Sequence, residues 1–272
     1  MQEFEGRTAF ITGGASGIGL AMARSFAAAG MRVAIADVEA PALAAAVASL
    51  RASNADVLGI ELDVRDRLAM DAAARQVTDH FGAVHVLCNN AGVGAGGPLQ
   101  DATHADWDWT LGVNLQGVIN GLQSFLPGMI AHGEGGHVVN TASMAGLLGV
   151  GGMGIYNASK FAVVGLSESL IQDLVGTGVG VSVLCPGFVR TNIFDSTRNR
   201  PDELAGAPRT RSEEDEARVE EIIARAIEPQ QVAEQVLEAV RTEQFWIFTH
   251  PEFADVVKAK MGMMAAAFGT GS

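Results

Sequence analysis

The chain has 272 residues, of which 48% are apolar and 18% are charged, and its formal net charge is −13 at pH 7. The apolar content is enough for a substantial globular core, whereas the negative charge disfavours nucleic acid or an anionic membrane surface as a partner. The first residues, MQEFEG, lack the basic and apolar regions of a signal peptide, and the sequence has no apolar run of membrane-spanning length, so we expect a cytoplasmic protein with no membrane contact.

Short apolar segments alternate with longer segments of helical pattern along most of the chain. Strands are predicted at 7–12, 33–37, 57–63, 84–92 (ending in a turn), 137–143, 179–187 and 245–248. Helices are predicted at about 20–30, 41–53, 66–80, 104–132, 155–176 and 229–242.

The predicted strands are nearly all apolar, and most are separated by helices of ten or more residues. This pattern is typical of a parallel sheet that is buried on both sides. We therefore predict an α/β fold, a single-domain Rossmann-type doubly wound parallel sheet with helices on both faces. The sequence has no Pro/Ser-rich linker or internal repeat, so one domain is expected to span residues 1–272.

The two cysteines, Cys88 and Cys185, each end an apolar run. This position favours buried free thiols in a reducing cytoplasm over a disulfide or a catalytic thiol. We predict no metal site.

A glycine-rich turn, GGASGIG at 13–19, lies between the first predicted strand and the helix that follows it. Glycines in such a turn let the backbone approach a ligand closely, and the helix N-terminus offers free N–H groups to a phosphate. A tight turn without a ligand is the alternative, but the strand–turn–helix context favours a dinucleotide. The residues expected to hold it here are Gly13, Ser16, Gly17, Ile18 and Gly19.

An aspartate, Asp37, stands at the end of the second predicted strand, eighteen residues after Gly19. A carboxylate at this place accepts hydrogen bonds from the ribose hydroxyls of a dinucleotide, and it repels a 2′-phosphate. Val38 follows, without an adjacent arginine to receive such a phosphate, so we predict NAD as the cofactor and consider NADP the weaker choice. The alternative is that Asp37 only caps the turn that follows it.

The segment 143–160, SMAGLLGVGGMGIYNASK, contains Tyr156, the single tyrosine of the chain. Lys160 follows four residues later, and residues four apart share one face of a helix. A neighbouring ammonium group is expected to lower the pKa of the phenol, whose ordinary value is ~10. Ser143 can return to the same point across the Gly-rich loop, so the three side chains suit proton exchange with an alcohol or carbonyl oxygen. The alternative is a packed aromatic residue beside a solvated lysine.

Six motifs follow one another along the chain: TGGASGIG at 12–19, NNAG at 89–92, Asn114, Ser143, Tyr156-x-x-x-Lys160 and PGFVRT at 186–191. With these motifs the chain resembles the short form of the short-chain dehydrogenase/reductase family over roughly residues 5–192. The glycine spacing separates it from the extended, epimerase-like branch, and the Tyr–Lys offset separates it from the enoyl reductases.

The resemblance implies roles in cofactor binding. Asp63 and Val64 would border the adenine, Asn90 would support the centre of the sheet, and Ala91 and Gly92 would line the ribose. The nicotinamide carboxamide would be held by the turn residues Pro186, Gly187, Val189 and Thr191.

The resemblance also implies catalytic roles for four residues. Asn114 would kink its helix and hold a water in a proton relay with Lys160, which would also bind the nicotinamide ribose. Ser143 would polarise the carbonyl, and Tyr156, beside the cofactor, would be the acid/base. Turn formation, capping or core packing is the alternative for each.

Three loops at the predicted carboxyl ends of the strands are candidates for substrate binding: 93–99, 144–153 and the segment after Phe188. They are apolar, and the first two contain no lysine or arginine that could bind a carboxylate or phosphate. We therefore expect a neutral, bulky, hydrophobic secondary alcohol or ketone. The residues expected to contact it are Ser143, Leu147, Met153, Phe188, Ile193 and Phe194.

A long polar insertion follows at about 192–228, and a C-terminal tail occupies about 249–272. An insertion of this length suits a lid over a site, with a solvated mobile segment as the alternative. The tail carries Met261, Met263 and Met264 at loosely helical spacing. It either packs on a neighbouring subunit, closes the pocket or joins the core.

Three stretches, 108–122, 125–139 and 228–253, are similar to those of one branch of the family, the bacterial dehydrogenases that oxidise the benzylic alcohol of lignin-derived aryl ethers. The resemblance implies an NAD(H)-dependent enzyme that interconverts a bulky aryl or benzylic secondary alcohol and its ketone. A hydroxysteroid dehydrogenase or a general carbonyl reductase is the alternative within the family, and a non-catalytic NAD-binding sensor is the alternative outside it. Family members form homotetramers or homodimers, usually through the helices that carry Asn114 and Tyr156.

Overall fold

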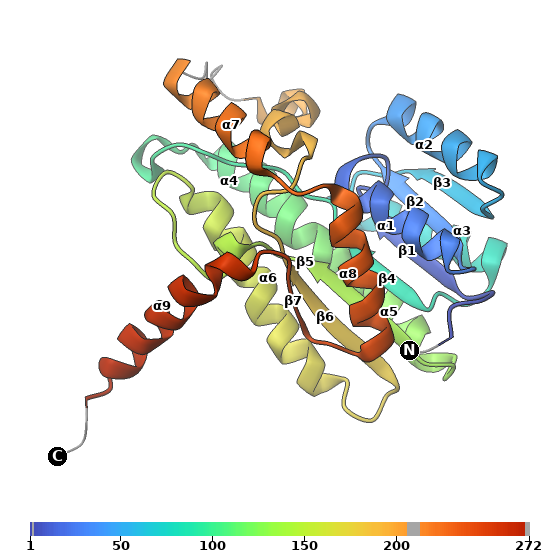
Figure 1. The fold of residues 1–272 in the computed structure, drawn as a ribbon. Coiled ribbons are helices and arrows are strands. Elements are labelled where there is room, and N and C mark those ends of the chain that lie inside the picture. Colours follow the sequence, from blue (N-terminus) through green and yellow to red (C-terminus); the bar gives the residue numbers. More distant parts are fainter. Residues whose placement is uncertain (2, 206–212, 270–272) are drawn as a thin grey trace.

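The computed structural model describes residues 1, 3–205 and 213–269 of the chain. At its centre seven parallel strands form one sheet in the order β3-β2-β1-β4-β5-β6-β7 (Figure 1). The chain builds the sheet outward from β1 in one direction and then, from β4 on, in the other. Sheets of this kind bind ligands at the carboxyl ends of the strands, next to the point where the order reverses. The strands are β1 Thr8–Thr12, β2 Arg32–Asp37, β3 Val57–Glu61, β4 Val86–Asn89, β5 Gly136–Thr141, β6 Val179–Cys185 and β7 Trp246–Phe248.

Helices cover both faces of the sheet, as the sequence predicts. On one face α3, α5 and α6 form a hydrophobic cluster with alternate strand residues such as Phe10 and Leu87. On the other face α1, α2 and α8 form a second cluster with the intervening residues, such as Ile11 and Cys88. Successive strand side chains point to opposite faces, so a sheet covered on both sides needs strands that are apolar throughout.

The helices in the described residues are α1 Gly17–Ala28, α2 Ala40–Ala52, α3 Arg67–Phe81, α4 His104–Leu111, α5 Gly117–Ala131, α6 Gly154–Asp173, α7 Glu213–Arg225, α8 Pro229–Thr242 and α9 Ala254–Ala266. None of these helices is long and apolar enough to cross a lipid bilayer.

The long helical region expected over 104–132 is present, and it is distorted in its middle. A π-helical segment, Gly112–Gln116, separates α4 from α5. Such segments insert a residue into a helix and often mark functional sites. Gly117 begins α5 against Val64, where a Cβ atom would lie 2.7 Å from the valine Cγ2. The glycine therefore lets the helix resume in close contact with the loop after β3.

The described part of the insertion after β6 is built of short helical segments. It contains a distorted 3-10 helix, η4, at Asn192–Asn199, a second short 3-10 turn at Asp202–Leu204, and then α7. Residues 206–212 of the predicted insertion lie outside the described part of the chain.

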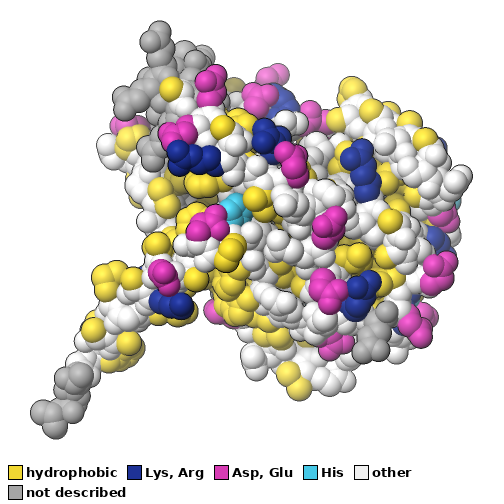
Figure 2. Space-filling view, viewed as in Figure 1, with side chains coloured by type: hydrophobic (Ala, Val, Ile, Leu, Met, Phe, Trp, Pro, Cys, Tyr) yellow, Lys and Arg dark blue, Asp and Glu magenta, His cyan; other side chains and the backbone are white. Residues whose placement is uncertain are grey.

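The C-terminal tail projects from the body of the molecule as α9 (Figure 1). Its apolar side chains are visible along the projecting helix in Figure 2. Met261, Met263 and Met264 are 63%, 70% and 58% exposed, so the alternative that they join the core is wrong. Residues 270–272 of the predicted tail lie outside the described residues.

Both cysteines are buried and free, in agreement with the prediction. Burial raises the pKa of Cys185 to about 12 and also raises that of Cys88. A thiol with a raised pKa is protonated at neutral pH, so neither side chain has the character of a catalytic nucleophile.

A buried histidine, His137 of β5, makes the stability of the fold depend on pH. The Ser182 hydroxyl donates to the Gln244 carbonyl at 2.6 Å and accepts from His137 Nε2 at 2.7 Å, and the His137 Nδ1 finds no partner among the described residues. Burial lowers the pKa of His137 to about 4, because the charged ring would lose its hydration. The ring is therefore neutral in the folded protein.

We expect the free energy of unfolding to fall as the pH drops from about 6.5, the ordinary histidine pKa, to about 4. In this window the unfolded chain binds a proton at His137 that the folded chain does not, which costs up to ~3 kcal/mol at the acid end. Urea unfolding at pH 7 and 4.5 measures the difference, and His137→Gln removes the titrating group. The difference should shrink in the variant; an equal pH dependence in both proteins would contradict the assignment to His137.

Candidate active site

Tyr156, Lys160 and Ser143 meet at the carboxyl edge of β5. Tyr156 and Lys160 lie one turn apart in α6, and both are buried. Ser143 follows β5, and its hydroxyl accepts a hydrogen bond from the Ala145 N–H at 3.1 Å and also hydrogen-bonds the Tyr156 phenol. The structure thus brings together the three side chains that the sequence groups.

The loop between Ser143 and α6 is held against the helix by residues that the sequence did not single out. The Asn157 side-chain amide donates to the carbonyls of Ala145 at 2.8 Å and Leu148 at 2.7 Å. Gly146 packs so closely that a Cβ atom there would lie 2.7 Å from the Lys160 carbonyl oxygen. These contacts fix the position of the Ser143 hydroxyl relative to α6.

The pKa of Tyr156 shifts in the direction opposite to the prediction. Burial of the phenol raises it, because burial disfavours the phenolate, and the hydrogen bond with Ser143 lowers it by less. The Lys160 ammonium lies over the face of the tyrosine ring, 5.7 Å from its centre. Burial outweighs any lowering by Lys160, so the expected net lowering of the Tyr156 pKa is wrong for this structure, in which the phenol is protonated at neutral pH.

Lys160 is 3% exposed, which excludes the alternative of a solvated helix lysine. Its Nζ donates to the Thr141 carbonyl at 2.9 Å, and burial lowers its pKa to about 8. A Cβ atom on Gly92 would lie 3.6 Å from this Nζ and 3.4 Å from Asn114 Oδ1. The ammonium group therefore faces the loop after β4, beside Asn114.

Asn114 lies in the π-helical segment and is fully buried. Its Oδ1 accepts from the Val93 N–H at 2.8 Å, and its Nδ2 donates to the Val93 carbonyl at 2.9 Å and to Ser159 Oγ at 3.1 Å. The helix distortion expected at this residue is present. Its side chain joins the loop after β4 to α6, and the water relay with Lys160 stays a prediction.

The glycine-rich turn has the backbone that close approach to a ligand requires. Gly13 and Gly17 have φ of +64° and +53°, a region that favours glycine. A Cβ atom on Gly19 would lie 2.0 Å from the Gly13 carbonyl oxygen. Ser16 precedes α1, and its hydroxyl makes no capping bond to a described residue, so the helix N-terminus suits a phosphate group. Ile18 packs partly buried against the second hydrophobic cluster.

Thr12 and Asn90 join the first turn to the loop after β4, where the strand order reverses. The Thr12 hydroxyl accepts from the N–H groups of Asn90 at 2.9 Å and Ala91 at 3.0 Å. The Asn90 side-chain amide donates to the Thr12 carbonyl at 2.9 Å. This network supports the predicted role of Asn90, and it gives Thr12, the first residue of the TGGASGIG motif, a role in joining the two loops.

Asp37 ends β2 beside the glycine-rich turn. Its Oδ2 accepts from the Ala15 N–H at 3.0 Å, and its Oδ1 accepts from the Glu39 N–H at 3.1 Å. The carboxylate therefore caps the following turn while it also faces the dinucleotide turn. Burial raises its pKa, against the backbone hydrogen bonds that lower it.

The two residues expected beside the adenine follow β3. Asp63 forms an ion pair with Arg65, with Oδ2 and Nη2 2.7 Å apart. Val64 is buried, and its carbonyl accepts from the Asn120 side-chain amide at 2.8 Å. Both residues lie at the carboxyl edge of the sheet, on the same side of β1 as Asp37.

The turn after β6 lies against the tail through a residue that sequence reasoning missed. His250 Nδ1 accepts from the Gly187 N–H at 3.2 Å, and its Nε2 donates to the Phe188 carbonyl at 3.1 Å. A Cβ atom on Gly187 would lie 2.8 Å from the His250 ring. The other end of the turn after β6 lies against the glycine-rich turn after β1, because a Cβ atom on Gly17 would lie 3.0 Å from Thr191 Cγ2.

Two further residues of this turn were predicted to hold a cofactor. Pro186 is buried, and its carbonyl accepts from the Met144 N–H at 2.9 Å. Val189 is buried as well and forms an isolated bridge with Ile227. The turn therefore connects the loop after β5 with the end of the insertion.

The predicted substrate contacts lie in the loops after β5 and β6, and they differ in burial. Phe188 is 44% exposed and lies 6.4 Å from the ring of Phe253, measured between ring centres. Lys260 of α9 donates to the Leu147 carbonyl, so the tail reaches the predicted substrate loop. The remaining predicted contacts are partly buried: Met153, Ile193 and Phe194.

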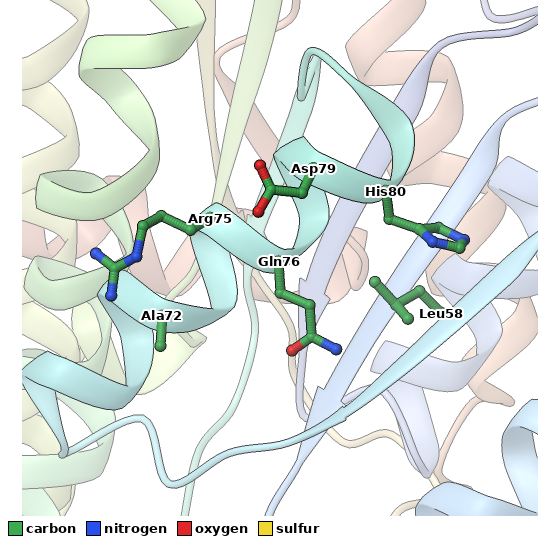
Figure 3. Close-up of a pocket in the computed structure, with 6 residues that line it drawn as sticks. All are labelled: Leu58, Ala72, Arg75, Gln76, Asp79 and His80. Carbon is green, nitrogen blue, oxygen red and sulfur yellow. The ribbon is translucent and has the colours of Figure 1, made fainter.

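The pocket drawn in Figure 3 does not belong to this site. It lies between the outer side of α3 and Leu58 of β3, next to the strand edge that is remote from Tyr156. Its polar lining residues are Arg75, Gln76, Asp79 and His80.

Three side chains lie just before the amino ends of β4 and β5, at a spacing that a metal ion could use: His85, His132 and Glu134. His85 Nδ1 accepts from the Thr8 N–H, and His132 Nδ1 accepts from the Glu134 N–H. Each Nε2 then carries the proton, which is donated to the Glu134 carboxylate or to the Val84 carbonyl. Hydrogen bonding therefore accounts for the cluster.

Comparison with protein families gives a match over residues 7–202 to the model described as short chain dehydrogenase. A curated relative, "C alpha-dehydrogenase" from Sphingobium sp. (strain NBRC 103272 / SYK-6), is 40% identical over 253 residues, which are 93% of this chain and 83% of the relative.

Two solved structures resemble the fold over nearly its full length. A short chain dehydrogenase/reductase from Burkholderia phymatum in complex with NAD has a TM-score of 0.94 and 43% identity, covering 98% of this chain and 97% of the other. The apo form of LigO from Sphingobium sp. strain SYK-6 has a TM-score of 0.84 and 38% identity, covering 98% of this chain and 91% of the other.

Proposed function

Because the chain belongs to the short chain dehydrogenase family and is an oxidoreductase that uses a nicotinamide cofactor, we propose that it interconverts a bulky aryl or benzylic secondary alcohol and its ketone with NAD(H). The observation that carries the reaction class is that the buried Tyr156 and Lys160 meet the partly buried Ser143 at the carboxyl edge of β5. An NAD-binding sensor would not need an acid/base group of this kind.

When bound, the cofactor supplies the hydride chemistry. The protein positions the substrate and moves the proton. Tyr156 donates its phenolic proton to the carbonyl oxygen in reduction and takes the alcohol proton in oxidation, and Ser143 hydrogen-bonds the same oxygen. Lys160 is a buried cation on the same helix face, where an opposite charge stabilises the phenolate that remains.

The proposed cofactor-binding residues follow the carboxyl edge of the sheet. The first turn offers the α1 N-terminus to the pyrophosphate, and Asp37 accepts from the adenosine ribose. A ribose 2′-phosphate would meet the partly buried Asp37 carboxylate, which supports NAD over NADP. Asn114 contributes by holding the loop after β4 against α6.

The apolar character of the loops around Tyr156 supports a hydrophobic substrate. Leu147, Met153 and Phe188 offer apolar surface, and the cation that reaches this loop, Lys260 of α9, donates to the Leu147 backbone carbonyl. The relative named C alpha-dehydrogenase, similar over 93% of this chain, supports an aryl carbinol within this class.

We also propose that the protein is a homodimer or homotetramer. Apolar residues remain exposed on α5 and α6, among them Ile130 at 38% and Phe161 at 38%, as well as on α9. Burying such surface against a second copy is favourable.

Absorbance of the reduced nicotinamide tests the proposal directly. A panel of benzylic, aryl-ether and steroid alcohols is offered with NAD and with NADP in parallel. We expect the benzylic and aryl-ether alcohols to react with NAD. Turnover of steroid alcohols alone would contradict the substrate class, and turnover with NADP alone would contradict the role of Asp37. NAD binding by calorimetry without turnover of any alcohol would indicate a sensor.

A further inference from the structure

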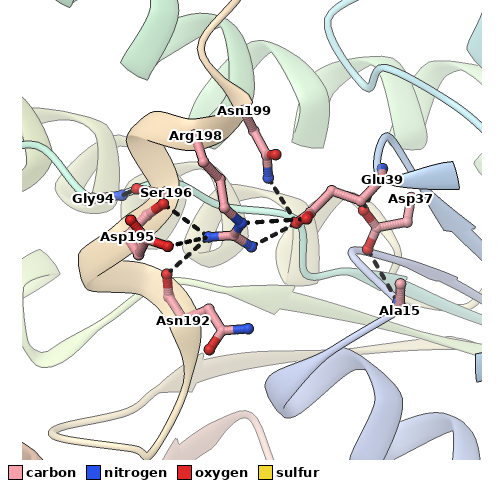
Figure 4. Close-up of polar contacts among 9 residues, drawn as sticks. All are labelled: Ala15, Asp37, Glu39, Gly94, Asn192, Asp195, Ser196, Arg198 and Asn199. Atoms are coloured by element: carbon pink, nitrogen blue, oxygen red, sulfur yellow. Dashed lines mark hydrogen bonds and ion pairs between the residues drawn. The ribbon is translucent and has the colours of Figure 1, made fainter. Parts of the chain in front are cut away.

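The 3-10 helix η4, Asn192–Asn199, crosses the carboxyl edge of the sheet and is attached on both sides of it. On the catalytic side, Ser196 Oγ accepts from the Gly94 N–H at 2.9 Å. On the nucleotide side, Arg198 and Asn199 bind the carboxylate of Glu39, which lies in the turn after β2 (Figure 4). The insertion therefore brings a guanidinium to a place that is remote from it in the sequence.

The Arg198 guanidinium is held by several acceptors at once. Its Nε and Nη2 donate to the two oxygens of Glu39, the first at 3.2 Å, and its Nη1 donates to the Asp195 carbonyl at 2.8 Å. Asn199 Nδ2 donates at 2.8 Å to Glu39 Oε1, the oxygen that also accepts from Arg198 Nη2. The side chains of Arg198 and Glu39 are 31% and 29% exposed, so water screens the pair only in part.

This pair lies beside the carboxylate that is proposed to bind the ribose. The Glu39 N–H donates to Asp37 Oδ1 at 3.1 Å, and Figure 4 shows both acidic side chains next to each other in the turn after β2. Arg198 lowers the pKa of Glu39, and the pKa of Arg198 is raised chiefly by its hydrogen bonds with Glu39, with a smaller contribution from the Asp37 carboxylate. A cation is thus present beside the proposed binding site of the adenosine ribose, although the sequence has no arginine next to Asp37.

We propose that Glu39 sets the cofactor preference by holding Arg198, so that its guanidinium is withheld from the 2′-phosphate of NADP. The inference rests on the proposed role of Asp37 at the adenosine ribose. Arginine binds phosphate with two parallel hydrogen bonds, and a phosphate competes with a carboxylate for the same donors. While Glu39 occupies Nε and Nη2, a 2′-phosphate meets two carboxylates and finds the arginine already engaged.

The test compares dissociation constants of NAD and NADP for the full-length protein, measured by calorimetry. Glu39→Gln keeps the size of the side chain and removes its charge, so Arg198 is released while Asp37 stays in place. We expect the ratio of NADP affinity to NAD affinity to rise by about tenfold or more, because one repulsive charge is lost and one guanidinium is freed. Since this rise in relative NADP affinity is electrostatic, it should become smaller as salt is added.

A second substitution assigns the gain to Arg198. Arg198→Met in the Glu39→Gln background should remove most of the rise in the ratio and leave only the part that comes from the lost repulsive charge. Arg198→Lys should keep more of the rise, because an ammonium binds phosphate as a point charge. Glu238→Gln breaks the exposed ion pair of Glu238 with Arg241 on α8 and is the matched control, for which the ratio should not change.

Several results would overturn the inference. If Glu39→Gln changes the affinities for NAD and NADP by the same factor, the pair is only a structural contact of η4. If the ratio rises but survives Arg198→Met, the gain comes from lost repulsion alone. A wild-type protein that prefers NADP would contradict both this inference and the proposed cofactor, whereas an NAD-preferring wild type with unresponsive variants would contradict this inference alone.

Discussion

Replacing Tyr156 by phenylalanine is expected to lower turnover by about 10²–10⁴-fold, the usual loss when an acid/base group is removed. The phenol is the group proposed to exchange a proton with the substrate oxygen, and phenylalanine fills the same buried space without a hydroxyl. The affinity for NAD should stay near that of the wild type. Absorbance of the reduced nicotinamide measures turnover, and calorimetry measures NAD binding.

Glu168→Gln is a suitable control, because Glu168 is an exposed residue of the same helix, α6. Its turnover should match that of the wild type. Turnover of the phenylalanine variant within about tenfold of the wild type would contradict an acid/base role for Tyr156. A loss of NAD binding equal to the loss of turnover would show that the tyrosine acts mainly through the cofactor.

Gly19→Ala is expected to have the second large effect, this time on cofactor binding and stability. The added Cβ would lie 2.0 Å from the Gly13 carbonyl oxygen and 2.7 Å from Asn90 Nδ2, so the turn must shift. Overpacking of this kind costs ~1–3 kcal/mol of stability. Since the turn is the proposed site of the pyrophosphate, NAD affinity should fall by more than about tenfold, as 1.4 kcal/mol of lost binding corresponds to that factor. Thermal unfolding and calorimetry measure the two effects.

The chain offers a matched glycine for comparison. Gly165 also lies in a helix, α6, but a Cβ atom there would have no described atom within 4 Å. Gly165→Ala should stabilise the protein by up to ~1 kcal/mol, because alanine is the better helix former. A Gly19→Ala variant that binds NAD as tightly as Gly165→Ala would exclude the close approach that the structure shows.

The fold was predictable from the sequence because its signals are local and repeated. Apolar strands such as 33–37 and 179–187 alternate with long helical patterns, and this alternation admits few topologies. The distortion at Gly112–Gln116 was expected only through the family resemblance at Asn114, because π and α segments share nearly the same side-chain pattern.

The site was predictable where neighbours in sequence are also neighbours in space. Tyr156 and Lys160 share a helix, and the turn glycines share one loop. The sequence could not show that Arg198 reaches Glu39 or that His250 supports Gly187, because these pairs lie far apart along the chain. The pKa of Tyr156 was predicted in the wrong direction, because burial depends on the whole fold and outweighs the local pattern.

All described strand pairs of the sheet are parallel, and this has a consequence for how the protein folds. Neighbouring parallel strands cannot be joined by a tight hairpin, so each pairing requires a long crossover loop to close. Such non-local pairings form slowly, and the catalytic group depends on several of them. Recovery of NAD-linked activity during refolding would therefore report on completion of the sheet, whereas helical circular dichroism would report earlier events.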